Sequence, residues 1–310
     1  MSSTIETVHI VGMGALGLLY GGMIAEHLGP EHVAYVMDAA RYARHREDTY
    51  RINGRGVRLP ILRAEDAGPC DLLIVAVKYT QMEGALETMR TSVGEDTIIL
   101  SVMNGISTEK IIGEHYGMDR VLYTVAQGMD AMRFGTALTF TKSGQLHVGV
   151  DDPAKQEKLD RVTDFFDRAG IAYVVEEDIR RRIWSKFMVN VGLNQTCMVY
   201  STNYAGVTAP ESLEHMTMVS AMREVILLAR AEGVALTEED LKSYLALLKT
   251  FSPEATPSMG QDRINRNPSE VELFAGTVIR LAKKHGILVP TNEFLYRRVG
   301  EIEAEYAKGE

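Results

Sequence analysis

Short runs of apolar, mostly β-branched residues alternate with helical stretches through the first half of the chain. The runs cover residues 8–11, 33–37, 72–77, 97–102 and 121–126. Four of them are continuously apolar instead of alternating between apolar and polar positions, as expected for parallel strands buried on both faces. Strands and helices in this order predict a doubly wound α/β domain.

The pattern changes twice further along the chain. The Asn53-Gly54 pair within residues 51–59 indicates a hairpin inserted at the edge of the sheet. A helix is expected over 153–169, and further strands are expected at 137–141, 145–150 and 171–175. Beyond residue 178 the strands stop, and long helical segments are expected at 179–200, 211–232, 237–251 and 269–286. We therefore expect an α/β domain over residues 1–177 and an all-α domain over residues 178–310.

Composition excludes several classes of function. The 310 residues include 33 Lys and Arg against 42 Asp and Glu, so the net charge of −9 argues against a nucleic-acid or anionic-membrane partner. Cys70 and Cys197 lie far apart without a CxxC pair, so we expect neither a disulfide nor a metal site. Without a signal-peptide pattern or a long apolar span, we expect a cytoplasmic protein.

The clearest motif follows the first apolar run. A glycine-rich segment separates that run from the helical residues 18–28, and it reads Gly12, Met13, Gly14, Ala15, Leu16, Gly17. In this position Gly12 allows a tight turn, Gly14 lets a diphosphate approach the backbone, and Gly17 lets the helix pack on the sheet. A glycine-rich turn without a ligand is the alternative. The strand before and the helix after favour a Rossmann-type cofactor site.

Polar residues follow the next three runs. Asp38 stands where an acid usually binds the ribose 2′-hydroxyl of NAD, although Arg41 and Arg44 could reach a 2′-phosphate instead. Asp38 could also simply cap the following helix. Lys78 and Asn104 are candidates by position, because ligands bind beyond the carboxyl ends of parallel strands. A solvated lysine and an Asn-Gly turn are the alternative interpretations of these two residues.

One helical segment of the second domain places three polar residues on a single stripe. Lys186, Asn190 and Asn194 are spaced at i, i+4 and i+8 among mostly apolar residues. Buried amides and ammonium groups need partners. The stripe therefore predicts either an interhelical hydrogen-bond ladder or a site in which the pKa of the lysine is lowered toward a catalytic value.

A carboxylate and a hydroxyl complete the set of candidates. Glu270 lies on the apolar face of the helix expected over 269–286, whereas Glu272 points away from it. Lys186 is the cation we expect to pair with Glu270, and a charge at an exposed helix start is the alternative. Ser258 stands at a loop-to-helix junction, where it could cap the helix or contact a ligand carboxylate.

Taken together, these residues resemble the ketopantoate reductase family over almost the whole chain. The resemblance rests on the N-terminal GxGxxG, Val75-Ala76-Val77-Lys78, Asn104-Gly105, the WxKxxxN segment from Trp184 to Asn190, Ser258-Met259 with Gln261-Asp262, Glu270 before Gly276, and His285-Gly286-Ile287 before Val289-Pro290. It implies NAD(P)H-dependent reduction of 2-dehydropantoate to pantoate in pantothenate biosynthesis, with NADPH as the usual cofactor and a small 2-oxo acid as substrate.

The resemblance also implies a role for each residue. Lys186 is the implied general acid, and Glu270 holds this lysine and contacts the substrate hydroxyl and the cofactor. Asn190, Asn194 and Ser258 hold the substrate hydroxyl and carboxylate. Asn104 and Lys78 lie where cofactor and substrate meet. Hydride addition to a ketone develops negative charge on oxygen, which a neighbouring ammonium can stabilise and protonate.

Two residues depart from the family pattern. Asp38 stands where a basic residue is common, which suggests NADH, and Gln195 stands where a proline is common, which suggests a different pocket wall. A reductase of another branched 2-oxo acid, a 3-hydroxyacid or opine-type dehydrogenase, and a nucleotide-sensing module without turnover are the alternatives. The apolar faces of the helical domain are sufficient for a homodimer.

Overall fold

The continuously apolar runs form the centre of an eight-stranded sheet in the first of two compact units. The computed structural model describes residues 4–306, and the units are Met1–Arg182 and Ile183–Glu310. The division falls inside one long helix, α6, which begins at Ile179. The expected boundary at residue 177 stays a prediction.

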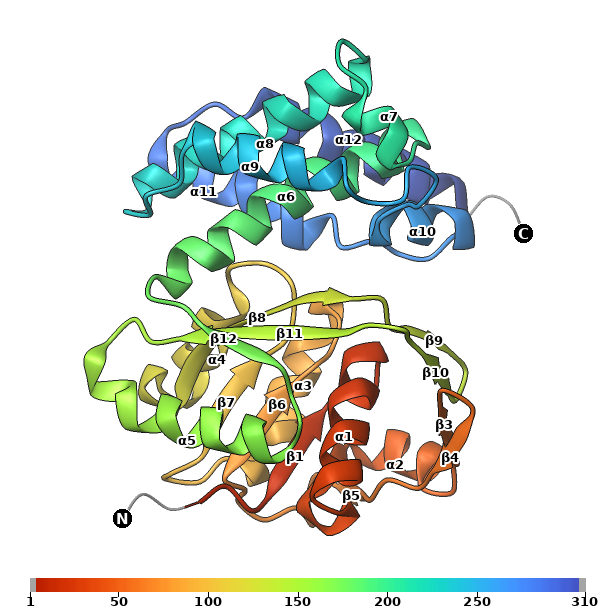
Figure 1. The fold of residues 1–310 in the computed structure, drawn as a ribbon, viewed down its shortest axis with the longest axis vertical. Coiled ribbons are helices and arrows are strands. Elements are labelled where there is room, and N and C mark those ends of the chain that lie inside the picture. Colours follow the sequence, from red (N-terminus) through yellow and green to blue (C-terminus); the bar gives the residue numbers. More distant parts are fainter. Residues whose placement is uncertain (1–3, 307–310) are drawn as a thin grey trace. The chain divides into compact units, whose positions relative to one another are not determined.

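Strand order in the sheet is that of a Rossmann fold. The sheet runs β12-β11-β8-β7-β6-β1-β2-β5, and every neighbouring pair is parallel except β8 with β11 (Figure 1). Its strands are β1 Val8–Val11, β2 Val33–Met37, β5 Ile61–Arg63, β6 Leu72–Val75, β7 Ile98–Ser101, β8 Val121–Met129, β11 Ser143–Gly149 and β12 Tyr173–Val175. The order reverses between β1 and β6, which is where such sheets bind ligands.

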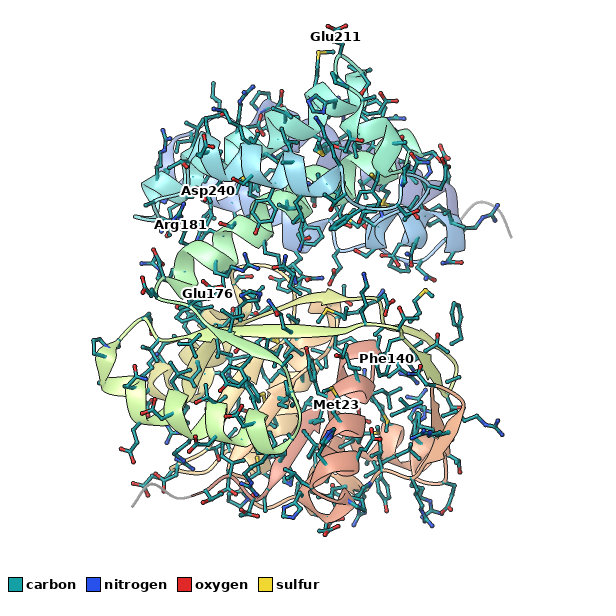
Figure 2. The ribbon with its side chains drawn as sticks, in the orientation of Figure 1. Met23, Phe140, Glu176, Arg181, Glu211 and Asp240 are labelled. Carbon is teal, nitrogen blue, oxygen red and sulfur yellow. The ribbon has the colours of Figure 1, made fainter. Side chains whose placement is uncertain are left out.

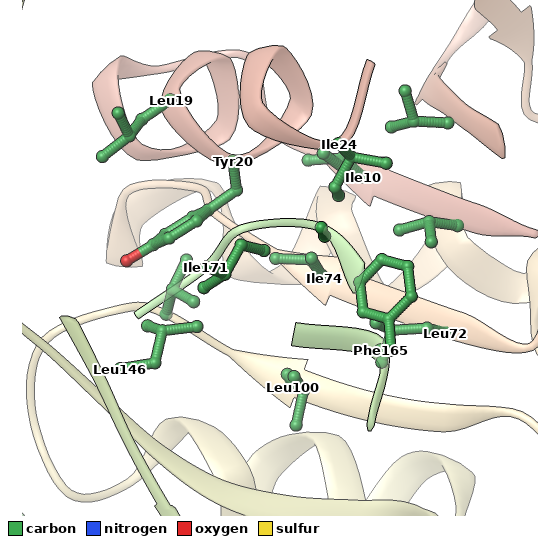
Figure 3. Packing of buried hydrophobic residues seen from close by; sticks show 14 of the residues in the cluster. Ile10, Leu19, Tyr20, Ile24, Leu72, Ile74, Leu100, Leu146, Phe165 and Ile171 are labelled. Atoms are coloured by element: carbon green, nitrogen blue, oxygen red, sulfur yellow. The ribbon is translucent and has the colours of Figure 1, made fainter. Parts of the chain in front are cut away.

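Helices cover both faces of this sheet because successive strand side chains point to opposite sides. Ile10, Leu72 and Leu100 join the apolar cluster that includes α1 Ala15–His27 and α5 Gln156–Arg168 (Figure 3). Their neighbours Val11, Leu73 and Ile99 join a second cluster with α3 Met82–Met89 and α4 Thr108–Tyr116. Helix α2 Ala39–His45 follows β2, and 3₁₀ turns occupy Pro30–His32, Tyr79–Gln81, Arg90–Ser92, Met118–Arg120 and Pro153–Lys155.

The hairpin is confirmed, but its place in the sheet is not. Asn53 and Gly54 both have positive φ, as a tight hairpin turn requires, and they connect β3 Tyr50–Ile52 to β4 Arg55–Val57. The hairpin belongs to a separate four-stranded sheet, β4-β3-β10-β9, with β9 Met132–Phe134 and β10 Ala137–Thr139. Residues of α1 and of this small sheet share one apolar cluster, with Met23 and Phe140 at its margin (Figure 2).

Through residue 306, the second unit contains helices and no strands, which together with the sheet above confirms the expected fold class. Its helices are α6 Ile179–Tyr200, α7 Tyr204–Thr208, α8 Leu213–Ala231, α9 Glu238–Leu248, α10 Ser258–Asn265, α11 Thr277–His285 and α12 Pro290–Tyr306. Side chains cap several starts: Thr237 and Asp240 form a reciprocal capping box at α9 (Figure 2). Within the described residues, none of the helices has the length and apolar content needed to cross a bilayer.

Two expectations about the C-terminal helices are wrong. Residues 269–286 do not form one α-helix, because a π-helical turn, η6 Glu272–Gly276, precedes α11. The series of expected long helices also stops too early, at residue 286, since α12 follows. The stripe that α12 buries is sparse, with Leu295, Val299 and Ile302 separated by charged residues.

Candidate functional site

The glycine loop between β1 and α1 is shaped by close backbone contacts. Gly12 has a φ of 106°, and a Cβ placed there would lie 2.4 Å from the carbonyl oxygen of Ala76. A Cβ on Gly17 would lie 2.0 Å from the carbonyl oxygen of Gly12. Gly12 therefore lets the loops after β1 and β6 touch, and Gly17 lets α1 pack onto the loop.

Gly14 serves a different purpose. Its φ is negative, and the nearest atom to an added Cβ is the Ala76 carbonyl oxygen at 3.8 Å, so space remains open beside it. Helix α1 begins at Ala15 with no side-chain cap, and the first amides of a helix lack partners within it. An open backbone next to a positive helix end fits the diphosphate of a dinucleotide.

Arg133 contacts this loop, and sequence reasoning missed it. Its Nη1 donates to the carbonyl oxygen of Met13, and its Nε donates to the carbonyl oxygen of Gly135 at 2.8 Å. Among residues 4–306, no carboxylate lies within ion-pair distance of Arg133. The contact depends on β9 pairing with β10 and β10 with β3, so nothing in the local sequence around Arg133 indicates it.

Asp38 caps α2 and also lines a pocket. Its Oδ1 accepts the backbone N–H of Arg41 at 2.9 Å, and its Oδ2 lies 3.5 Å from Arg41 Nε. The pocket has a volume of about 590 Å³, and its lining includes Asp38, Arg41, Glu87 and Arg90. The capping interpretation of Asp38 is therefore correct, and the carboxylate keeps access to a space large enough for a nucleoside.

Lys78 and Asn104 follow neighbouring parallel strands. Lys78 is exposed and begins the 3₁₀ turn after β6, while Asn104 is half-buried after β7 and precedes Gly105, whose φ is 95°. Because β1, β6 and β7 are consecutive and parallel, both residues leave the sheet at the same edge as the glycine loop. The first unit thus gathers its candidate residues at the carboxyl end of its central strands.

The polar stripe on α6 is connected to α10 in the second unit. Lys186 and Asn190 are half-buried, and Asn194 is only 5% exposed. The side-chain nitrogen of Asn194 donates to Asn190 Oδ1 at 3.3 Å, and its Oδ1 accepts from Ser258 Oγ at 3.0 Å and from Met259 N at 3.4 Å. Ser258 therefore does not cap α10, since its hydroxyl is directed to Asn194 instead.

Glu270 lies in the bend immediately before the π turn. It is half-buried, whereas Glu272 is exposed and pairs with Arg280 at 3.4 Å, so the two carboxylates differ as expected. The carbonyl oxygen of Glu270 accepts from Leu273 N at 3.0 Å and from Phe274 N at 3.1 Å. The backbone of Glu270 is thus fixed, and its pairing with Lys186 stays a prediction.

Comparison with known proteins covers both units. Residues 8–152 match the sequence family described as ketopantoate reductase PanE/ApbA, and residues 178–303 match the family of its C-terminal region. A 2-dehydropantoate 2-reductase from Streptococcus pyogenes is 26% identical over 307 residues, which span 96% of this chain and 98% of that protein.

Solved structures show the same fold over nearly the full length. The ternary structure of D-mandelate dehydrogenase with NADH and anilino(oxo)acetate has a TM-score of 0.85 and 23% identity, covering 97% of this chain and 99% of that one. A dimeric ketopantoate reductase from Staphylococcus aureus has a TM-score of 0.78 and 22% identity, with the same coverage.

Proposed function

The chain belongs to the ketopantoate reductase family, and we propose that it reduces 2-dehydropantoate to pantoate in pantothenate biosynthesis. Members of this family are NAD(P)-dependent oxidoreductases, and so is this chain. The observation that carries the proposal is the hydrogen-bonded set of Asn190, Asn194 and Ser258 beside Lys186 on α6. A nucleotide-sensing module without turnover has no need of this set.

The hydrogen bonds within this set assign donors and acceptors. Asn194 uses both ends of its amide inside the protein, so we assign it the task of orienting Asn190 and Ser258. Asn190 accepts from Asn194 through its oxygen, which leaves its amide nitrogen to donate to a substrate carboxylate. Ser258 donates its hydrogen to Asn194, which leaves its oxygen to accept from a substrate hydroxyl.

Lys186 is the proposed general acid. When bound, the nicotinamide supplies the hydride that reduces the ketone. The carbonyl oxygen then gains negative charge, and an ammonium group beside it both stabilises that charge and donates the proton. Glu270 is proposed to hold the Lys186 ammonium and to contact the substrate hydroxyl and the cofactor. A half-buried lysine keeps its charge more readily beside such a carboxylate.

The proposed cofactor residues are those whose geometry fits a dinucleotide. The loop residues Gly12, Met13, Gly14, Ala15, Leu16 and Gly17 would hold the diphosphate, since Gly14 is open and α1 lacks a side-chain cap. Lys78 and Asn104 would lie near the nicotinamide end. Asp38 would accept the ribose 2′-hydroxyl, because its carboxylate lines the pocket beside β2.

A direct assay tests the activity. Purified protein is mixed with 2-dehydropantoate and with NADH or NADPH in parallel, and the loss of reduced-nicotinamide absorbance is followed. Turnover with at least one cofactor is expected. No turnover with either would overturn the assignment, and nucleotide binding without turnover on any 2-oxo acid would favour the sensing module.

Asp38 allows a separate test of cofactor choice. We expect NADH to be preferred, and Asp38→Asn to raise the NADPH to NADH ratio of kcat/KM because it removes the charge that repels a 2′-phosphate. Asparagine caps helices as well as aspartate does, so stability should be kept, whereas Asp38→Ala also loses about 0.5–2 kcal/mol of cap energy. An unchanged ratio in Asp38→Asn would show that Asp38 is only a cap.

A second candidate function is the reduction of a different 2-oxo acid. One observation favours it: the fold shared with a D-mandelate dehydrogenase solved with NADH and anilino(oxo)acetate. Values of kcat/KM for 2-dehydropantoate, 2-oxo-3-methylbutanoate and phenylglyoxylate would separate the two candidates. The substrate with the highest value identifies the natural class.

We also propose that the chain forms a homodimer. A dimeric relative with this fold is known, and α8 exposes Leu213, Met216 and Leu227. Sedimentation equilibrium should give twice the mass of the 34.4 kDa chain. A monomer at micromolar concentration would contradict the proposal.

A further inference from the structure

The π turn before α11 is held by a side chain from α6. The amide of Gly276 donates to the carbonyl oxygen of Val271 at 3.0 Å, five residues earlier, which defines the π pattern. The amide of Ala275 donates instead to Gln195 Oε1 at 3.0 Å. In an α-helix this amide would bond to Val271. Turns of this kind are rare and are frequently found at functional sites.

A chain of buried hydrogen bonds fixes the orientation of Gln195. The Glu224 carboxylate accepts Thr291 N at 2.8 Å and Asn292 N at 2.9 Å at the start of α12. As an acceptor, it requires Asn292 to donate through its side-chain nitrogen, at 2.7 Å. The Asn292 oxygen is then left to accept from Gln195 Nε2, at 3.4 Å.

The donor and acceptor roles in this series of hydrogen bonds allow only one orientation of the Gln195 amide. Its nitrogen donates to Asn292 and to the carbonyl oxygen of Val191 at 2.7 Å, so its oxygen must face Ala275. Gln195 has no exposed surface, and Glu224 and Asn292 are also buried. Losing one member would leave a buried polar group unpaired, which proteins avoid. With no exposed surface, Gln195 does not itself line a pocket, and the expected difference in the pocket wall stays a prediction.

The π turn sets the rotation of residue Glu270 about the helix axis relative to α11. One residue of an α-helix corresponds to a rotation of about 100°. If Ala275 bonded to Val271, the turn would lose its extra residue, and Glu270 would rotate by about this angle relative to α11. The carbonyl oxygen of Glu270 is bonded to the amides of Leu273 and Phe274, so its backbone moves with the turn.

We propose that Gln195 is a positioning residue. It keeps residues 272–276 in the π-helical conformation and thereby orients the Glu270 carboxylate toward Lys186. This inference rests on the proposed function, in which Glu270 holds Lys186. The Ala275 amide needs a side-chain acceptor at residue 195, and Gln195 provides it.

The test compares Gln195→Leu with a matched control. Thr196 is equally buried on α6, and its hydroxyl has no hydrogen-bond partner among residues 4–306, so Thr196→Val removes a hydroxyl without breaking a contact. Crystal structures of both variants show whether residues 272–276 remain π-helical. Steady-state kinetics give kcat and its pH profile, and fluorescence titration gives the Kd for the reduced cofactor.

For Gln195→Leu we expect an α-helical turn, a loss of kcat of about 10- to 100-fold from the misplaced carboxylate, and a displaced pH profile. Thr196→Val should match the wild type in kcat, pH profile and cofactor Kd. In Gln195→Leu the glycine loop is untouched and only the Glu270 contact to the cofactor is lost, so the Kd for the reduced cofactor should rise by much less than kcat falls.

Two results would overturn the proposal: a π turn that persists in Gln195→Leu, or a lost turn with a wild-type pH profile. If Gln195→Leu does not fold, Gln195→Met, which has nearly the same length, takes its place. Failure of the proposed function is a separate result. A wild-type chain that reduces no 2-oxo acid would remove the role of Glu270, while the crystal structures would still decide whether Gln195 holds the turn.

Discussion

The glycine loop of the first unit and the polar stripe of the second are built from different parts of the chain. The loop offers backbone: Gly12 and Gly17 are required by contacts with carbonyl groups, and Gly14 leaves open space. The stripe offers side chains: Asn194 joins Asn190 to Ser258, which lies on another helix. One site depends on the path of the main chain, and the other on which side chains the helices bring together.

This difference determines how each site can fail. A backbone site fails when an added side chain collides with the main chain, which affects folding and binding together. A side-chain site fails when one group is removed, and the fold can survive the loss. We therefore expect coupled effects from a variant of the first unit whose new Cβ meets the main chain, as at Gly17, and separate effects from variants of the second unit.

The largest effect is expected from Lys186→Ala. Removing a general acid should lower kcat by about 10²–10⁴-fold, while the Kd for the reduced cofactor stays close to that of the wild type. Single-turnover kinetics and cofactor titration measure the two quantities. Lys242→Ala is the control, because this lysine on α9 is 69% exposed in its side chain and, among the residues that the structure describes, pairs only with the neighbouring carboxylate of Glu239.

An equal loss of kcat and cofactor affinity in Lys186→Ala would contradict the expectation that variants of the second unit show separate effects. It would show that α6 supports cofactor binding instead of proton transfer. A similar loss in Lys242→Ala would indicate a general effect of removing positive charge from this acidic chain.

Much of the sheet could be predicted because its signals are local. Strands β1 and β2 have the expected bounds, since each is a continuous apolar run that ends at a turn residue. Asn53 and Gly54 form the expected turn because few other residues adopt positive φ. The glycine loop is also a local signal, because the GxGxxG pattern is interpreted from the strand before it and the helix after it.

Other features depend on contacts between distant residues, which the local pattern does not show. The small sheet requires Ala137 to pair with Arg51, and the π turn requires Gln195 to reach Ala275. Arg133 reaches Met13 across 120 positions. The helix α12 did have a local signal, because Pro290 precedes Leu295, Val299 and Ile302 at helical spacing. Its many charged residues obscured this signal.

The next largest effect is expected in the glycine loop between β1 and α1, where two alanine variants are compared. Gly17→Ala should lower the unfolding free energy by about 1–3 kcal/mol, because the new Cβ would overlap a backbone carbonyl that cannot move aside. Gly14→Ala has space for its Cβ and a negative φ, so it should fold normally but bind the reduced cofactor more weakly. Calorimetry and cofactor titration measure the two effects. Normal cofactor affinity in Gly14→Ala would show that the diphosphate does not approach this residue.

A smaller effect is expected from Arg133→Gln. The carbonyl and the N–H of one peptide unit point in opposite directions, so the bond from Arg133 to the Met13 carbonyl fixes the direction of the Gly14 N–H. Glutamine should weaken binding of ADP-ribose about 3- to 10-fold, which corresponds to about 0.7–1.4 kcal/mol of lost orientation, and leave adenosine binding unchanged. Isothermal titration calorimetry measures both ligands.

Arg55→Gln is the control for Arg133. Arg55 lies on the same small sheet, with a side chain that is 85% exposed, and pairs with Glu26 at 3.8 Å. It should leave both affinities unchanged. If Arg133→Gln weakens adenosine as much as ADP-ribose, the arginine supports the small sheet as a whole instead of the diphosphate loop.

The smallest effect is expected in the reactivity of two buried thiols, Cys70 in the first unit and Cys197 in the second. Burial raises the pKa of Cys70 and of Cys197 to about 12. At pH 8 only about 10⁻⁴ of each would be thiolate, against about a quarter of an unperturbed thiol. Because the thiolate is the reactive form, iodoacetamide should label neither residue in the native protein, and both after denaturation in urea. Mass spectrometry of the two peptides measures the labelling rates.

The pH dependence of slow labelling separates two routes. If a thiol reacts in the folded state, its rate should rise tenfold per pH unit up to about pH 12, since the thiolate fraction rises with pH below the folded pKa. If it reacts only when its unit opens, the rate should level off above about pH 8.5, the pKa of an exposed thiol. We expect levelling for both residues. Levelling for Cys197 on α6 but not for Cys70 beside β6 would show that the two units differ in stability as well as in how their sites are built.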